Sequence, residues 1–158
     1  MSFKTTKIIS EDKGKFYHLL AQQAQGLLSV ENDRIANAAN LCSLLYHSLE
    51  EVNWVGFYFV QGSELVLGPF QGQVACTRIN IGEGVCGTAF HQNKTLRVDD
   101  VHAFKGHIAC DTASNSELVL PLTGLGVLDI DSPVLQRFDA LDQSGCEQIA
   151  NIYLKSTT

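Results

Sequence analysis

The first third of the chain repeats its apolar residues every three or four positions, which is the period of an amphipathic helix. This spacing predicts a first helix over residues 15–29 and a second helix that begins after Asn32 and Asp33 and runs to Val52. Asn and Asp cap helix N-termini, which supports the start of the second helix. Cys42 lies on the apolar side of that helix, so we expect it to fill space in the core.

From residue 53 onward, short apolar runs separated by glycine-containing turns replace the helical period, and this pattern predicts β-strands. The expected strands are residues 54–60, 64–67, 73–79, 95–98, 117–122 and 125–131. The first two form one hairpin, and the last two form another around Thr123 and Gly124. Cys76 is therefore expected on the third strand.

Residues 82–90 begin as a glycine-rich turn and continue as a short helix, whereas residues 99–115 show no period and predict a long loop over the sheet. A last helix is expected to open at Phe138 and Asp139 and to contain Cys146 in a structural role. These elements predict an α+β fold, with a central, mostly antiparallel sheet of five to six strands flanked by helices.

Composition narrows the classes of function. A chain of 158 residues suits one domain over residues 1–158, and no apolar run reaches the roughly 18 residues of a membrane helix. The N-terminus lacks the pattern of a signal peptide, so we expect a cytoplasmic protein without a membrane partner. Its five cysteines are then expected to be thiols that the cell keeps reduced, unless their own chemistry oxidises them. With 11 basic residues scattered along the chain and a net charge of −6, nucleic-acid binding is not expected.

Two acidic residues alternate with apolar ones on the last predicted strand. Successive side chains of a strand point to opposite faces, so Asp129 and Asp131 share one face about 7 Å apart while Leu128 and Ile130 enter the core. The acidic pair is either a solvated strand face or the lining of a pocket for a metal ion or an ammonium group.

Whether Glu117 joins this pair depends on the hairpin loop. A two-residue turn at Thr123 and Gly124 puts Glu117 on the opposite face, whereas a three-residue loop pairs it with Asp131. Only the second parity assembles three carboxyl groups on one face. Crowding would then raise the pKa of at least one of them, which would let it hold a proton near neutral pH as a general acid must.

The long predicted loop holds a second set of reactive residues. Cys110 lies in a glycine-containing segment with His107 and Lys105 close by, a setting that can lower a thiol pKa and yield a nucleophilic thiolate. Cys86 follows two glycines at a helix start, which also favours a thiolate. A zinc site of His102, His107 and Cys110 is the rival, but the spacing lacks paired C-x-x-C knuckles, so we expect no metal.

Eight short motifs follow one another along nearly the whole chain after the first helix. They are NWVGFY (53–58), LGPFQG (67–72), AC (75–76), GEGVCGTA (82–89), DVH (100–102), GHIACD (106–111), SNSE (114–117) and GVLDIDS (126–132). In this order they resemble the free methionine-(R)-sulfoxide reductases, a family built on a GAF domain. The chain departs from the family at the second hairpin, which has only Thr-Gly-Leu between Leu122 and Gly126 and is shorter than the family's.

The resemblance implies a GAF-like fold and an enzyme that reduces the R epimer of free methionine sulfoxide to methionine. It implies that Cys110 is the nucleophile and that Cys86 and Cys76 are the other redox cysteines, one of which resolves the intermediate as a disulfide. It further implies a set of substrate-binding residues, which are Trp54, Tyr58, Glu117, Asp129 and Asp131.

The same resemblance implies no bound cofactor, thioredoxin as the external reductant, and a homodimer. Two other functions fit the residues. A non-catalytic GAF module would use the pocket to hold a small ligand, although such modules are usually fused to an output domain. A peroxide-sensing thiol protein would use Cys110 and Cys86, although carboxyl groups near a thiol raise its pKa and hinder that reaction.

Overall fold

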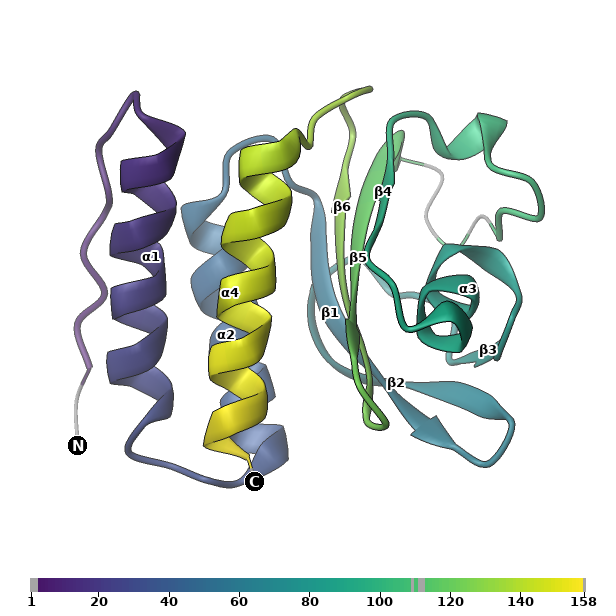
Figure 1. Ribbon diagram of the computed structural model, residues 1–158, viewed down its shortest axis with the longest axis horizontal. Coiled ribbons are helices and arrows are strands. Elements are labelled where there is room, and N and C mark those ends of the chain that lie inside the picture. The colour runs from purple at the N-terminus through teal and green to yellow at the C-terminus, as the bar shows by residue number, and fades with distance from the viewer. Residues whose placement is uncertain (1–2, 109, 111–112, 158) are drawn as a thin grey trace.

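The computed structural model describes residues 3–108, 110 and 113–157, which form one sheet with helices on both of its faces (Figure 1). The six strands lie in the order β3-β2-β1-β6-β5-β4, and each neighbouring pair is antiparallel. They are β1 (Trp54–Gln61), β2 (Glu64–Gly72), β3 (Arg78–Asn80), β4 (Leu96–Val98), β5 (Ser116–Leu122) and β6 (Gly126–Ser132). The predicted α+β class and antiparallel sheet are confirmed.

Three long helices cover one face of the sheet, and a short helix lies on the other (Figure 1). The long helices are α1 (Lys13–Leu28), α2 (Arg34–Ser48) and α4 (Ala140–Ser156), and the short one is α3 (Gly84–Gln92). The side chains of Asp12, Asp33 and Asp139 accept hydrogen bonds from backbone N–H groups in the first turns of α1, α2 and α4. The expected helix starts at Asp33 and Asp139 are therefore confirmed.

Each face of the sheet buries its own apolar cluster. The cluster under the long helices contains Phe57, Leu120, Leu128 and Ile130, together with Cys42 and Cys146. Both cysteines are fully buried, as expected for structural residues. The smaller cluster beneath α3 contains Trp54, Tyr58, Val119, Val127 and Cys86. The candidate chemistry thus lies on the α3 face, away from the larger core.

The hairpin between β5 and β6 has a three-residue loop, which is the parity that gathers the acids. Leu122 pairs with Gly126, and Glu117 pairs with Asp131. Gly124 has a φ of 73°, a left-handed conformation that glycine adopts without strain in so tight a loop. The side chains of all three acidic residues consequently point to one face of the sheet.

The predicted strand over residues 73–79 is mostly wrong, because only its last two residues belong to β3. In the preceding segment, the N–H of Leu67 on β2 donates to the carbonyl of Thr77, but two other carbonyl groups accept hydrogen bonds from side chains of β1. The Trp54 Nε1–H donates to the carbonyl of Gln73 at 3.0 Å, and the Tyr58 hydroxyl donates to the carbonyl of Cys76 at 2.9 Å. Cys76 therefore lies on a loop rather than on a strand.

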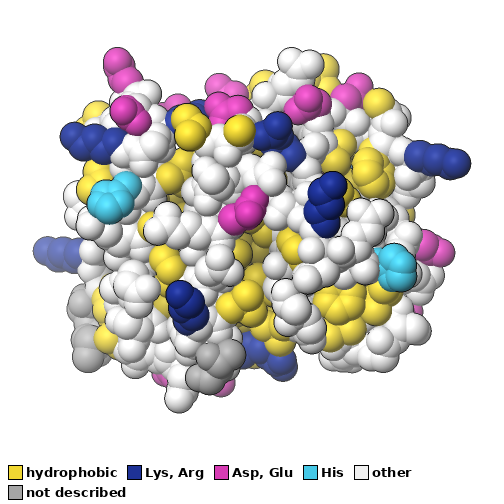
Figure 2. All heavy atoms as spheres, in the orientation of Figure 1, with side chains coloured by type: hydrophobic (Ala, Val, Ile, Leu, Met, Phe, Trp, Pro, Cys, Tyr) yellow, Lys and Arg dark blue, Asp and Glu magenta, His cyan; other side chains and the backbone are white. Residues whose placement is uncertain are grey.

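Charged side chains are spread over the molecular surface. Figure 2 shows Lys and Arg side chains lying apart from one another on one face, with acidic side chains between them. Within residues 3–108, 110 and 113–157, no helix combines the length and the apolar composition that a bilayer crossing needs.

Candidate active site

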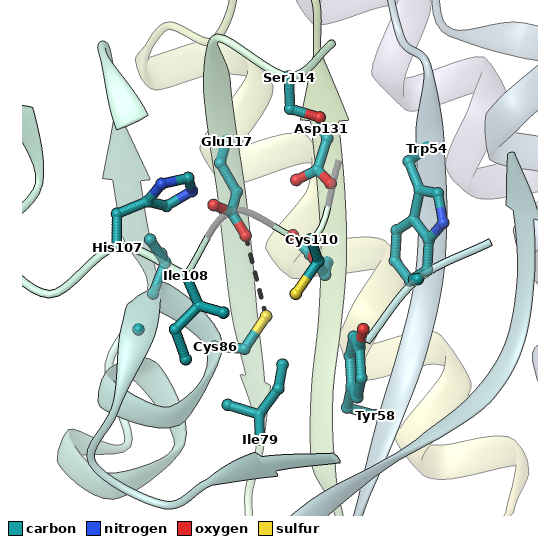
Figure 3. Close-up of a pocket in the computed structure, with 14 residues that line it drawn as sticks. Trp54, Tyr58, Ile79, Cys86, His107, Ile108, Cys110, Ser114, Glu117 and Asp131 are labelled. Carbon is teal, nitrogen blue, oxygen red and sulfur yellow. Dashed lines mark hydrogen bonds between the residues drawn. The ribbon is translucent and has the colours of Figure 1, made fainter. Parts of the chain in front are cut away.

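A cavity of about 50 Å³ lies on the α3 face of the sheet, enclosed by strands, by α3 and by the loop that carries Cys110 (Figure 3). Seven of the eight residues singled out from the sequence line it: Trp54, Tyr58, Cys86, Cys110, Glu117, Asp129 and Asp131. The eighth, Cys76, is joined to Cys110 by a disulfide. Segments far apart along the chain thus converge on one small space.

The disulfide links two loops across 34 positions of sequence. Cys76 lies between β2 and β3, Cys110 lies between β4 and β5, and their Cα atoms are 5.3 Å apart. Both residues are half-buried, whereas Cys86 is a buried free thiol. The sequence left open whether Cys76 or Cys86 pairs with Cys110, and this structure contains the Cys76 pair.

Cys86 lies in the first turn of α3, and the expectation that this helix start favours a thiolate is wrong. Burial, followed by the charges of Asp129 and Glu117, raises the pKa of the Cys86 thiol well above its ordinary value. The Sγ atom lies 3.8 Å from Oε1 of Glu117 and donates a hydrogen bond to it (Figure 3). Cys86 is therefore a protonated thiol in this state.

The three acidic residues form the polar side of the cavity. Glu117 is 7% exposed and Asp129 is 5% exposed. Burial raises the pKa of Glu117, and burial together with the charges of Asp131 and Glu117 raises the pKa of Asp129 well above its ordinary value. The buried Oδ1 atom of Asp129 has no hydrogen-bond partner within the described residues.

No Lys or Arg balances this acidic side among the described residues that line the cavity, where His107 is the basic residue and its pKa is lowered by burial. Buried carboxylates are stable only when they are paired or protonated. The cavity is thus suited to hold protons on its carboxyl groups or to accept a cationic group from outside.

An aromatic wall faces the acids. The ring of Trp54 stacks on Tyr58 with centroids 6.0 Å apart and on Phe70 with centroids 5.3 Å apart. Glycine is required beneath this ring, because a Cβ atom on Gly56 would collide with the Trp54 side chain. The wall offers a broad apolar surface to the end of a ligand that does not meet the acids.

Backbone hydrogen bonds hold the loop that carries Cys110 against the sheet. The N–H of Asn115 donates to the carbonyl of Ser132 at 2.8 Å, and the N–H of Val101 donates to the carbonyl of Asn115 at 3.0 Å. His102 Nε2 lies 3.0 Å from Oδ1 of Asn115. The predicted long loop is confirmed, while residues 109 and 111 of the GHIACD motif lie outside the described residues.

The structure separates the residues that were expected around Cys110. His107 lines the cavity, whereas Lys105 does not. Burial, with a smaller contribution from the charge of His102, lowers the pKa of His107. The histidines do not form the rival zinc site either, because the described residues with metal-ligating atoms within 4.8 Å of one another are Cys86, Glu117 and Asp129.

Sequence reasoning did not single out six residues of the lining, namely Ala75, Ile79, Gly84, Val85, Ile108 and Ser114. Ser114 is 7% exposed and accepts a hydrogen bond from Nδ2 of Asn53 at 3.3 Å. Ile108 and Ser114 belong to the quoted GHIACD and SNSE motifs, which was the signal available for them. The spacing of apolar residues alone gives no sign of which of them face a cavity.

Comparisons with known proteins address the family of the chain. No protein-family model matches it. The free methionine-R-sulfoxide reductase of Escherichia coli is 50% identical over 142 residues, which span 87% of this chain and 86% of that protein. A free methionine-R-sulfoxide reductase from Neisseria meningitidis, solved in complex with its substrate, is 40% identical with a TM-score of 0.92, covering 97% of this chain and 95% of that one.

A solved GAF domain is also similar, with 37% identity, a TM-score of 0.89, and coverage of 94% of this chain and 91% of that one. Proteins can share a fold at much lower sequence identity than these, and the alignments extend over most of each chain. The chain therefore has the GAF fold and belongs to the free methionine-R-sulfoxide reductase family, a family of oxidoreductases.

Proposed function

We propose that this protein reduces free methionine (R)-sulfoxide to methionine, with Cys110 as the nucleophile and thioredoxin as the reductant. The observation that carries the proposal is the convergence of a disulfide-forming cysteine, three carboxyl groups and an aromatic wall on one cavity. The names of the relatives from E. coli and N. meningitidis support the same substrate. Their names supply the preference for the R epimer.

In this proposal, the acids bind the substrate's ammonium group and Trp54 packs against its sulfur end. An ammonium ion supplies the positive charge that the buried side chain of Asp129 lacks in the described structure. A peptide nitrogen at the same position is neutral and would leave the carboxylates unpaired, which costs several kcal/mol, about 10²-fold or more in binding. Peptide-bound methionine sulfoxide is therefore rejected.

The first chemical step breaks the sulfur–oxygen bond of the substrate. The Cys110 thiolate attacks the sulfoxide sulfur and forms a sulfur–sulfur bond, while a protonated carboxyl group transfers its proton to the sulfoxide oxygen. The hydroxyl group then passes from the substrate sulfur to the Cys110 sulfur as the new sulfur–sulfur bond breaks, which leaves Cys110 as a sulfenic acid and releases methionine. Glu117 and Asp129 suit the donor role because their pKa values are raised, so that a proton remains on the pair.

The second step forms the disulfide. The thiol of Cys76 attacks the sulfenic sulfur of Cys110, and the oxygen leaves as water. The 5.3 Å between their Cα atoms and the disulfide itself support Cys76 for this role, while Cys86 remains a thiol hydrogen-bonded to Glu117. No bound cofactor takes part, because all electrons come from the two cysteines.

Thioredoxin then returns two electrons by thiol–disulfide exchange, for which the half-buried disulfide must be reached by an external thiolate. The cytoplasm is the compartment we propose, since its reducing poise keeps such thiols available. Because Cys110 lines the cavity and must react as a thiolate, substrate reacts there after the Cys76–Cys110 disulfide has been reduced.

A thioredoxin-coupled assay with separated epimers tests the proposal. Free R and S methionine sulfoxide and the same two epimers within a peptide are offered in parallel. We expect turnover of the free R epimer alone. Absence of turnover with all four would favour a ligand-binding GAF module, and equal use of the peptide would contradict the role of the acids.

A further inference from the structure

We propose that Cys86, Glu117 and Asp129 form a binding site for Zn²⁺, and that zinc bound there inhibits the enzyme by occupying the place of the substrate's ammonium group. The inhibitory part rests on the proposed function, whereas the metal site stands on the geometry alone.

The donor atoms of the three residues are already gathered. One ligand atom from each of Cys86, Glu117 and Asp129 lies within 4.8 Å of the others. A sulfur and an oxygen that share a tetrahedral zinc ion are about 3.6 Å apart, given Zn–S and Zn–O bonds of about 2.3 and 2.1 Å. The Cys86 Sγ atom and the Glu117 Oε1 atom are 3.8 Å apart, so they need to move by only a few tenths of an ångström.

A second observation points to a missing cation rather than to an acidic cluster as such. Asp129 is only 5% exposed, and it lines the cavity. Its Oδ1 atom has no hydrogen-bond partner within the described residues. No Lys or Arg is found among the described residues of the lining. A divalent cation would therefore satisfy an oxygen that has no hydrogen-bond partner among the residues the structure describes.

The ligand set favours zinc over the hard cations. Mg²⁺ and Ca²⁺ prefer six or more oxygen ligands, whereas zinc takes thiolate and carboxylate ligands in a four-coordinate site. Zinc binding replaces the proton of the Cys86 thiol, and that proton is released to solvent. Figure 3 shows the sulfur of Cys110 pointing toward that of Cys86, so a reduced Cys110 can supply the fourth ligand.

Zinc at this position interferes with catalysis in two ways. It uses the oxygens of Glu117 and Asp129 that the substrate's ammonium group needs, and it withdraws the carboxyl proton that the sulfoxide oxygen needs. When Cys110 is reduced, zinc also binds its thiolate and thereby blocks the proposed nucleophile. Free zinc therefore acts as an inhibitor that competes with substrate.

Cobalt supplies a spectroscopic test, because Co²⁺ bound to a thiolate absorbs in the near ultraviolet. The test uses the protein with its Cys76–Cys110 disulfide intact, so that neither of these sulfurs is available as a thiolate. We expect one equivalent of Co²⁺ to produce the thiolate band and one equivalent of Zn²⁺ to remove it. Absence of the band overturns the site, whatever the outcome of the substrate assay.

Matched variants assign the thiolate. Cys86→Ser should abolish the band, while Cys146→Ser, which changes an equally buried thiol outside the cavity, should keep it. A band that persists in Cys86→Ser contradicts the proposal. Should Cys86→Ser fail to fold by circular dichroism, Asp129→Asn decides, since it should weaken Zn²⁺ binding at least about tenfold and unchanged affinity contradicts the site.

Inhibition is measured separately by single turnover. Reduced enzyme freed of small thiols is mixed with free methionine (R)-sulfoxide, with and without one equivalent of Zn²⁺, and the methionine formed is quantified. We expect zinc to suppress the product and added substrate to relieve the suppression. An unchanged yield with zinc bound overturns the inhibitory role, whereas no product without zinc means that the proposed function itself has failed.

Discussion

Two buried acidic sites lie on opposite faces of the same sheet, and they differ in how their charge is balanced. On the face of the long helices, Asp142 is 1% exposed and accepts hydrogen bonds from Lys13 at 2.7 Å, Arg137 at 3.2 Å and the Tyr17 hydroxyl at 2.7 Å. On the α3 face, Asp129 is 5% exposed, and its Oδ1 atom has no hydrogen-bond partner within the described chain.

The difference separates a structural acid from a functional one. Asp142 is held by two cations and also completes the capping box at the start of α4, so its partners are all within the fold. Asp129 lies beside other acids in a cavity, and burial with their charges raises its pKa. A buried carboxyl group that the fold leaves unsatisfied indicates a partner that comes from outside.

The largest effect expected from this comparison concerns the cysteines of the two faces. Cys110→Ser removes the proposed nucleophile and should reduce turnover of free methionine (R)-sulfoxide to background, because a serine hydroxyl cannot form the sulfenic acid. Cys146→Ser, on the other face, should keep turnover within about twofold of the wild type if it folds. Full activity of Cys110→Ser in the coupled assay would refute the assignment.

The next effect is on stability. Asp142→Asn leaves Arg137 without this carboxylate, leaves Lys13 with Asp139 as its carboxylate partner, and weakens the capping box. We therefore expect a loss of about 2–3 kcal/mol in the free energy of unfolding. This value lies below the full cost of breaking a buried pair because Lys13 is 38% exposed. Urea denaturation measures it, and a loss below about 0.5 kcal/mol would contradict a structural role.

Asp129→Asn should show the reverse pattern. Removing one of three crowded acids relieves repulsion, so the free energy of unfolding should stay the same or rise. The variant loses one charge-assisted hydrogen bond to the substrate's ammonium group, worth about 1.5–3 kcal/mol, so kcat/KM should fall roughly 10- to 100-fold. Steady-state kinetics at limiting substrate measures the loss, and an unchanged kcat/KM would remove Asp129 from the proposed site.

Local sequence rules predicted the features that depend on neighbouring residues, which are the helix starts and the possible pairings of the second hairpin. The helix starts at Asp33 and Asp139 follow from the capping preference of aspartate and are confirmed. Hairpin parity narrowed the acids to two arrangements, and the loop of three residues in the structure brings Glu117 opposite Asp131. The remaining site residues were predicted from the motifs that resemble those of the reductases.

Long-range packing decided what the sequence could not. Asp142 was not singled out, because Lys13 lies 129 positions away and only the packing of α1 against α4 joins them. Cys86 was expected as a thiolate because helix starts favour one, but burial among acids outweighs that effect. Cys76 was expected on a strand, yet side chains of β1 donate hydrogen bonds to the backbone carbonyl groups of Gln73 and Cys76.

The smallest effect is a pair of opposite pH dependences. The folded pKa of Asp129 is raised above the unfolded value of about 3.9, so the unfolded state binds fewer protons above that pH, and the wild type loses stability as pH rises toward the folded pKa. The pKa of Asp139 is lowered, chiefly by its hydrogen bond to Lys13, so its contribution is present above pH 3.9 and disappears as pH falls.

Urea denaturation of the disulfide form from pH 3 to 7 tests both signs. The stability of Asp129→Asn relative to the wild type should increase with pH by at most about 1.4 kcal/mol per pH unit. The deficit of Asp139→Asn should instead shrink toward the acid end of the range. If the stabilities of the two variants relative to the wild type changed with pH in the same direction, the prediction would be wrong. It rests on the ion pair between Lys13 and Asp139 and on the described surroundings of Asp129, where Oδ1 has no hydrogen-bond partner.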